Sequence, residues 1–117
     1  MRKLTKEFGK HYLVEFINCN PEKIKFVRKL KKPFLKAVAE SKTKILKYTF
    51  YQFKPFGVSG VVLIAESHFA LHTWPEENYS ALDILTCGKM YPEITIKELK
   101  NFFEAKKTKV RIFSRGF

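Results

Sequence analysis

The hydrophobic pattern divides the chain into short apolar runs separated by turn residues. Runs rich in β-branched and aromatic residues predict strands. These runs cover residues 11–17, 44–53, 58–65, 69–74, 79–85 and 109–113. The run 58–65 is apolar at nearly every position, which predicts a strand that is buried on both faces.

Two other segments repeat their apolar residues with helical spacing. In the first, Asn20-Pro21-Glu22 is typical of a helix N-terminus, and the apolar stripe that follows extends to about Ser41. Pro33 lies inside this segment and predicts a kink, or two short helices, near residues 31–33. In the second, Thr95-Ile96-Lys97-Glu98 fits a capping box with Thr95 as the cap.

The order of these elements, β-α-β-β-β-β-α-β, predicts the fold class. It indicates an α+β protein in which an antiparallel sheet carries two helices on one face, as a two-layer sandwich. The 117 residues form one domain, 1–117. A domain of this size buries a modest fraction of its surface, so we expect it to form an oligomer.

The charge balance is strongly basic, with 23 Lys and Arg against 11 Asp and Glu. A nucleic-acid or membrane partner would explain this excess, but the basic residues are dispersed along the chain, which favours a solvated Lys-rich surface. Residues 1–10 lack the apolar run of a secretion signal, and no segment has the ~20 apolar residues that span a bilayer. We therefore expect a cytoplasmic protein, with neither a membrane nor a specific nucleic acid as partner, whose Cys19 and Cys87 form no disulfide.

Residues 65–76 concentrate the side chains that could carry chemistry. His68 and His72 do not form a zinc pair, because four residues of a strand span ~13 Å, and we expect no metal. Ser67 lacks the Gly-x-Ser-x-Gly setting of a serine hydrolase, and no local signature supports Cys87 and His72 as a thiol hydrolase pair. Ser67 and His72 would point to opposite faces of one strand. A site that uses both needs a bend, or the end of a strand, near residues 66–68, where a turn can store backbone strain.

Four motifs occur in order along the chain: Phe56-Gly57-Val58-Ser59-Gly60, Ala65-Glu66-Ser67-His68, His72-Thr73-Trp74-Pro75-Glu76 and Thr86-Cys87-Gly88. Together they closely resemble the small prokaryotic S-adenosylmethionine decarboxylases, and the resemblance covers nearly the whole chain. It implies that the proenzyme cleaves itself between Glu66 and Ser67, into a β chain of residues 1–66 and an α chain of residues 67–117. Ser67 would become a pyruvoyl cofactor, which forms a Schiff base with S-adenosylmethionine and decarboxylates it to the aminopropyl donor for spermidine.

The resemblance also implies roles for single residues. His72 would be the proton acceptor in processing, Ser59 would hydrogen-bond the processing intermediate, and Cys87 would be the proton donor in decarboxylation. Glu76 would hold the ribose hydroxyls, and Phe53 and Phe69 are candidates to stack on adenine or to face the sulfonium. The active enzyme would be a homodimer of cleaved protomers, (αβ)2, with two active sites at the interface.

Other hypotheses stay open at this point. The nearest is a pyruvoyl-dependent arginine decarboxylase of the same family, and a remote one is a basic nucleic-acid-binding module. Trp74 and Cys19 are expected in the core, His11 is expected to be structural, and His68 is expected to cap a turn. Because the substrate is a cation, we expect a locally acidic site and basic residues on the outer helices; the acids concerned are Glu15, Glu66, Glu76, Glu77 and Asp83.

Overall fold

One antiparallel sheet forms the base of the molecule. The computed structural model describes residues 4–117, and its six strands lie in the order β2-β3-β4-β5-β1-β6. The strands are β1 (Glu7–Ile17), β2 (Ile45–Gln52), β3 (Val58–Ile64), β4 (Ser67–Trp74), β5 (Tyr79–Thr86) and β6 (Lys107–Gly116). Residues 1–3, which belong to the segment where no secretion signal is expected, lie outside this description.

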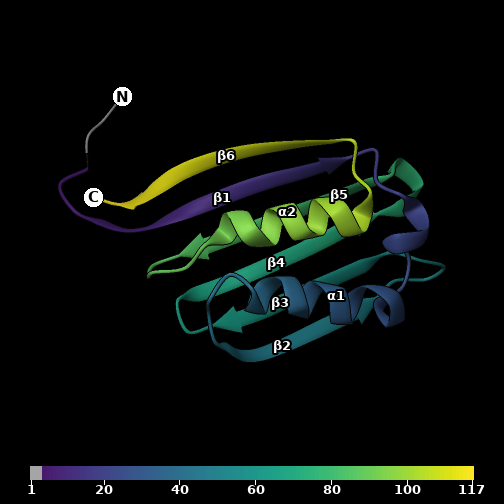
Figure 1. Cartoon of the computed structure of the whole chain (residues 1–117), viewed down its shortest axis with the longest axis horizontal. Coiled ribbons are helices and arrows are strands. Elements are labelled where there is room, and N and C mark those ends of the chain that lie inside the picture. The colour runs from purple at the N-terminus through teal and green to yellow at the C-terminus, as the bar shows by residue number, and fades with distance from the viewer. Residues whose placement is uncertain (1–3) are drawn as a thin grey trace.

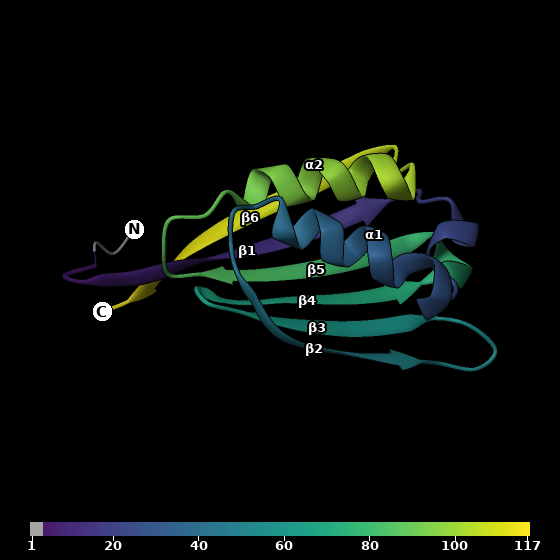
Figure 2. The ribbon, with the colours of Figure 1, turned by 60° about the horizontal axis from the view of Figure 1, so that its bottom comes forward.

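Two helices, α1 (Val27–Ala39) and α2 (Pro92–Phe103), form the second layer. Figure 2 shows both of them on the same side of the sheet, with no described element over the other side. The core lies between the layers, where alternate residues of each central strand meet the apolar stripes of the helices. Phe16 of β1, for example, packs edge-on against Phe103 of α2, with ring centroids 5.1 Å apart. The predicted α+β sandwich is therefore confirmed (Figure 1).

The first helix differs from its prediction in two ways. Asn20 caps only the 3-10 turn η1 (Pro21–Lys23), where its side chain accepts a hydrogen bond from the Glu22 N–H. The α-helix starts later, at Val27, whose N–H donates to the side-chain oxygen of Gln52. It continues unbroken through Pro33, since the buried face that it packs on the sheet outweighs one missing backbone hydrogen bond.

The second helix begins at Pro92, so the predicted capping box at Thr95 is wrong. Proline suits the first helical position because its missing N–H has no partner there in any case. Thr95 lies inside the helix instead, fully buried, and its hydroxyl donates to the Ala37 carbonyl at 2.7 Å. This bond joins α2 to α1.

The face of the sheet without helices, called here the open face, is more exposed than the sequence suggested. Val61 and Leu63 of β3 have exposed fractions of 37% and 48%, so this strand is not buried on both sides in the single chain. Trp74 of β4 is 41% exposed and is not a core residue. Cys19, in contrast, is buried as expected.

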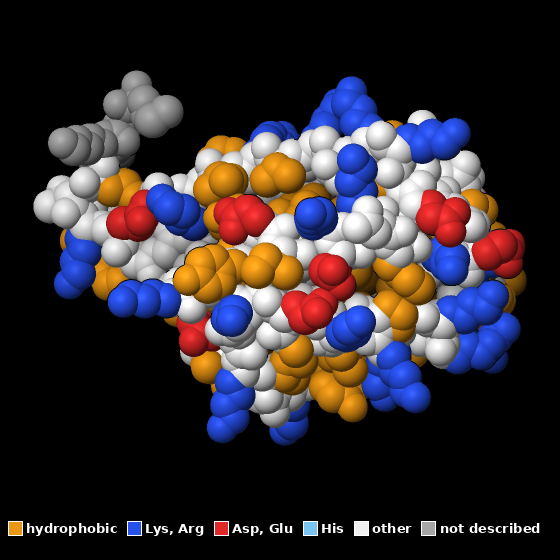
Figure 3. Space-filling model, viewed as in Figure 1, with side chains coloured by type: hydrophobic (Ala, Val, Ile, Leu, Met, Phe, Trp, Pro, Cys, Tyr) orange, Lys and Arg blue, Asp and Glu red, His pale blue; other side chains and the backbone are white. Residues whose placement is uncertain are grey.

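Charge is spread widely over the molecule. Figure 3 shows Lys and Arg around the outline of the helix face and between the acidic side chains. They are not gathered in one region of this face. The basic residues are not confined to the helices, because β6 also carries Lys107, Lys109, Arg111 and Arg115. Within residues 4–117, none of the helices is both long and apolar enough to cross a membrane.

Candidate active site

The connection between β3 and β4 is a tight turn made of Ala65 and Glu66. Ile64 and Ser67 pair across it as the last rung of the ladder. Ser67 has a φ of +149°, a backbone conformation that residues with a side chain rarely adopt. The strain expected at this turn is therefore found at Ser67 itself.

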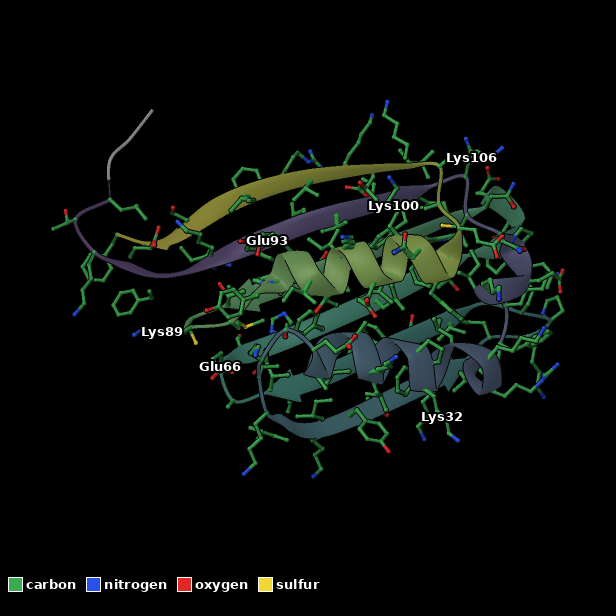
Figure 4. All side chains as sticks on the ribbon, in the orientation of Figure 1. Lys32, Glu66, Lys89, Glu93, Lys100 and Lys106 are labelled. Carbon is green, nitrogen blue, oxygen red and sulfur yellow. The ribbon has the colours of Figure 1, made fainter. Side chains whose placement is uncertain are left out.

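The Glu66 carbonyl is held by the residue that follows β5. The Cys87 N–H donates to this oxygen at 3.0 Å, and the Cys87 thiol lies 2.5 Å from it. The contact arises because Ser67 of β4 pairs with Thr86 of β5, which brings the next residue of β5 beside the turn. Two donors on one carbonyl oxygen form an arrangement that stabilises negative charge developing there. Figure 4 shows Glu66 at this end of the sheet, with the segment that carries Lys89 beside it.

A second group of predicted residues gathers at the other end of β4. Ser59 and His72 pair across β3 and β4, and Ser59 Oγ lies 2.8 Å from His72 Nδ1. Both side chains line a cavity of about 350 Å³ together with Phe53 and Glu76. The structure therefore joins these four predicted residues into one site.

Trp74 also lines this cavity, and the sequence analysis did not assign it there. Its indole stacks on the Tyr79 ring with centroids 5.3 Å apart, and lies 6.4 Å from the His72 ring. A signal was present: Trp74 is two residues after His72 on a strand, so both side chains point to the same face.

Phe69, which the sequence analysis named as a candidate for the site, lies in the core. Its side chain is fully buried among the core residues on the helix face of β4. It lies an odd number of residues from His72, so the alternation of the strand turns the two side chains to opposite faces. Phe69 therefore cannot contact a substrate in the cavity.

One chain does not bring Ser67 and His72 together. Both lie on β4, five residues apart, which separates them by about 16 Å at the usual rise of a strand. The strand end that was expected near residues 66–68 does occur, since β3 ends at Ile64 and β4 begins at Ser67. It lies before Ser67, however, so it does not shorten the distance between Ser67 and His72. The chain thus presents two half-sites: Glu66, Ser67 and Cys87 at the turn, and the cavity around His72.

His68 belongs to neither half-site. It lies on the open face near His11 and Asp83, where burial, and to a lesser degree the charge of His11, lower its pKa, while Asp83 opposes the shift. His11 Nε2 is 3.9 Å from an Asp83 carboxylate oxygen. Glu15 is also engaged, since it accepts hydrogen bonds from Arg111 at 3.2 Å and from the Tyr79 hydroxyl. Of the acids expected to make the site acidic, Glu15 and Asp83 therefore pair with other groups, whereas Glu76 lines the cavity.

In the described part of the chain, no three His, Cys, Asp or Glu side chains are arranged to hold a metal ion.

Comparison of this chain with known proteins identifies its family. Residues 10–116 match the family model described as S-adenosylmethionine decarboxylase. The chain belongs to the S-adenosylmethionine decarboxylase family. Its resemblance to that family, carried by four short motifs, thus extends to a match over nearly the whole chain.

Individual relatives agree with this assignment. The S-adenosylmethionine decarboxylase proenzyme of Thermodesulfovibrio yellowstonii is 41% identical over 109 residues, which cover 92% of this chain and 81% of the relative. The proenzyme of Pyrococcus furiosus is 43% identical, with coverage of 92% and 78%. The crystal structure of the adenosylmethionine decarboxylase from Aquifex aeolicus superposes with a TM-score of 0.86 at 29% identity, over 97% of this chain and 94% of that one. The family assignment therefore rests on both sequence and fold, and it makes this protein an enzyme of the decarboxylase kind.

Proposed function

We propose that this enzyme makes a pyruvoyl group from Ser67 and uses it to decarboxylate S-adenosylmethionine, which supplies the aminopropyl donor for spermidine. The observation that carries this proposal is the geometry at Glu66 and Ser67. The carbonyl before Ser67 faces two donors of Cys87, and the backbone at Ser67 is strained. Few other roles explain a strained serine beside a carbonyl that is prepared for negative charge.

Self-cleavage would use these contacts in sequence. The Ser67 hydroxyl oxygen bonds to the Glu66 carbonyl carbon, the bond from that carbon to the Ser67 nitrogen breaks, and the hydroxyl proton ends on the nitrogen. Negative charge on the Glu66 oxygen in this step is stabilised by the Cys87 N–H and thiol. Removal of the Cα proton of residue 67 then expels the Glu66 carboxylate and leaves dehydroalanine. Its imine tautomer takes up one water and releases ammonia, which leaves pyruvoyl on residues 67–117 and a new carboxylate on residues 1–66.

The base for the second step is assigned to His72, with Ser59 hydrogen-bonded to its ring. Because His72 lies about 16 Å from Ser67 on the same strand, the base must come from a second copy of the chain. The open face supports such a pairing. It leaves Val61, Leu63 and Trp74 more than one-third exposed, and two sheets that pack face to face would cover them. The proposed enzyme is therefore a homodimer, (αβ)2, in which each active site combines the turn of one protomer with the cavity of the other.

The cavity around His72 suits the nucleoside part of S-adenosylmethionine. Its lining combines the aromatic rings of Phe53 and Trp74 with the carboxylate of Glu76. A flat aromatic surface binds adenine by stacking and attracts a sulfonium by a cation–π interaction. A carboxylate can accept hydrogen bonds from both ribose hydroxyls.

A pyruvoyl group at residue 67 would supply an electrophilic carbonyl that binds the substrate amine and accepts the electrons released as carbon dioxide leaves. The chain's own contribution is to deliver a proton to the substrate α-carbon. Cys87 is assigned to this role, because its thiol is free, exposed and directly beside the turn. Two free cysteines also fit a reducing compartment, so we place the reaction in the cytoplasm.

The test of this proposal is the intact mass of the purified protein under denaturing conditions. The wild-type protein should contain two fragments that meet between residues 66 and 67, and Ser67→Ala should remain one chain. Carbon dioxide release from S-adenosylmethionine should accompany cleavage. A wild-type chain that stays intact after prolonged heating and carries no carbonyl reactive to hydroxylamine would refute the proposal.

A further inference from the structure

The cleavage turn is held in place by more than Cys87. The segment of residues 41–44, which leads from α1 into β2, lies along the turn on its other side. Its Lys44 carbonyl accepts a hydrogen bond from the Ala65 N–H at 2.9 Å. The hydroxyl of Thr43 donates to a carboxylate oxygen of Glu66. Glu66 is therefore fixed twice, through its carbonyl by Cys87 and through its side chain by Thr43.

The turn needs such support, because its sequence does not favour it. Two-residue hairpin turns normally contain Gly, Asn or Asp, which tolerate a positive φ. Here the two turn residues are Ala65 and Glu66, and the positive φ falls on Ser67. A strained conformation persists only when its surroundings hold it.

The segment that holds Glu66 is itself anchored. Ser41 is fully buried, its hydroxyl donates to the Val38 carbonyl, and its own carbonyl accepts from the Tyr91 N–H at 2.8 Å. On the opposite side, Gly88 leaves just enough space for the Glu66 side chain, since a Cβ at residue 88 would lie 2.5 Å from Glu66 Cγ. The Glu66 side chain is thus clamped between residues 41–44 and residues 87–91.

We propose that Thr43 is a positioning residue for self-cleavage, which holds the Glu66 side chain so that the Glu66 carbonyl stays at the two Cys87 donors. This inference rests on the proposed function, because it assumes that the bond between Glu66 and Ser67 is the one that breaks. Thr43 acts on the first step, in which the Ser67 oxygen displaces the Ser67 nitrogen from the Glu66 carbonyl carbon. It takes no part in proton removal or in turnover.

The test compares the first-order rate of chain cleavage in the full-length protein. Thr43→Val keeps the shape of the side chain and removes the donor, so cleavage should slow about tenfold or more, as expected for a lost hydrogen bond to a charged group. Thr43→Ser keeps the hydroxyl and should cleave within about threefold of wild type, since a hydroxyl at the same position can make the same bond. Equal rates in Thr43→Val and wild type would overturn the proposal while leaving self-cleavage intact. A wild-type chain that does not cleave would instead remove the proposed function, whatever Thr43 does.

Two measurements separate positioning from a general loss of structure. The uncleaved Thr43→Val chain should contain an amide and not an ester, so hydroxylamine should leave it whole; an accumulating ester would place Thr43 after the first step and refute the proposal. Glu66→Ala should also slow cleavage, and adding Thr43→Val to it should cost nothing more, because the hydroxyl then has no partner. Fully additive effects would refute an action through Glu66. If Thr43→Val does not fold, Gly88→Ala tests the same clamp from the other side: it should displace the Glu66 side chain and slow cleavage, and an unchanged rate would count against the clamp.

Discussion

Ser59 Oγ lies 2.8 Å from His72 Nδ1, at directly paired positions of β3 and β4. A hydroxyl in this place fixes the orientation of the imidazole ring and leaves Nε2 free to act on another group. The bond that is proposed to break lies at the other end of β4, so the oriented base and its target belong to different half-sites. The next two predictions follow from this separation.

Replacing His72 by Ala should stop processing at the ester. The first step, attack by the Ser67 hydroxyl, does not use this imidazole, whereas removal of the Cα proton does. The variant should therefore stay unprocessed in buffer and be split by hydroxylamine between residues 66 and 67, which mass spectrometry measures. Ser67→Ala is the control, because it forms no ester and hydroxylamine should leave it whole. A His72→Ala chain that cleaves at the wild-type rate would contradict the assigned role.

Mixing two inactive variants should restore cleavage if each site combines two chains. Ser67→Ala lacks the nucleophile but keeps His72, and His72→Ala lacks the base but keeps Ser67. Co-expressed with different tags, they should form mixed dimers in which the His72→Ala chain is cleaved by its partner's imidazole. The expected result is cleavage of that chain alone, seen as two fragments of one tag type. His72→Ala paired with a Ser67→Ala/His72→Ala chain is the matched control and should remain whole, because neither chain then supplies the imidazole. Absence of any cleavage in verified mixed dimers would show that the site lies within one chain.

Substrate choice should depend on Glu76. Removing its charge with Glu76→Gln should lower kcat/KM for S-adenosylmethionine by about 10- to 100-fold, through the loss of a charged hydrogen bond to ribose. Processing should still go to completion, since Glu76 is assigned to the ribose and to neither step of self-cleavage. Carbon dioxide release should be far weaker with arginine than with S-adenosylmethionine. A preference for arginine would reverse the substrate assignment and leave the cleavage chemistry standing.

The strand pattern predicted the sheet well. It did not predict the surroundings of side chains whose neighbours come from distant parts of the sequence. Because side chains alternate along β4, Phe69 and Trp74 lie on opposite faces of the sheet. The sequence alone does not reveal which of these faces the helices cover. Phe69 was therefore named as a candidate for the site and Trp74 was expected in the core, whereas Phe69 is fully buried and Trp74 lines the cavity. His72 is the residue that would have settled this, because Trp74 shares its face.

Other features depended on contacts that no local pattern reveals. Thr95 looks like a helix cap, but the Ala37 carbonyl of the other helix captures its hydroxyl. Cys87 meets the Glu66 carbonyl through the register of β4 and β5, and Thr43 reaches Glu66 from 23 residues away. Local sequence fixes neither a register between strands nor a contact between distant segments.

Stability should fall as the solution becomes acidic, in part because of His68. Its pKa is lowered in the folded protein by burial and by His11, so the unfolded chain binds more protons in the window below its ordinary pKa near 6.5. The contribution of the neutral His68 ring to the free energy of unfolding is fully present above pH 6.5. It is lost as the pH falls from there through the lower pKa of His68 in the folded protein. Thermal unfolding of the uncleavable Ser67→Ala protein should show this as a lower midpoint at about pH 5 than at about pH 7.5.

His68→Gln in the same background should make the dependence on pH shallower, because Gln does not titrate. Asp83 raises the pKa of His68 and so opposes this shift, which makes it the second residue to substitute. Asp83→Asn should deepen the dependence, since it removes the one facing charge that favours protonation of His68. Identical pH profiles in all three proteins would exclude His68 as the source.

Cys87→Ala should separate processing from turnover. The substitution removes the thiol and keeps the backbone N–H, so the Glu66 carbonyl retains one of its two donors. Cleavage should therefore be slower but should still go to completion, which mass analysis over time would follow. Decarboxylation should lose far more, because general acid catalysis contributes about 10²–10⁴-fold and the substitution removes the group that is assigned to this role.

The cleaved Cys87→Ala protein should also inactivate while it works. Without the assigned donor, the proton can reach the Cα that came from Ser67 and not the substrate carbon. Uptake of one water would then release the decarboxylated substrate as an aldehyde and leave its nitrogen on an N-terminal alanine of the fragment 67–117. Its appearance should increase with substrate turnover and be absent when substrate is withheld. Cys87→Ser is the matched control: it keeps a donor at the same position but a weaker acid, so it should cleave and retain more activity than Cys87→Ala. If Cys87→Ala turned over at the wild-type rate without inactivation, the thiol would serve only to hold the Glu66 carbonyl. His68, which follows Ser67 directly in the sequence, would then be the next donor to test.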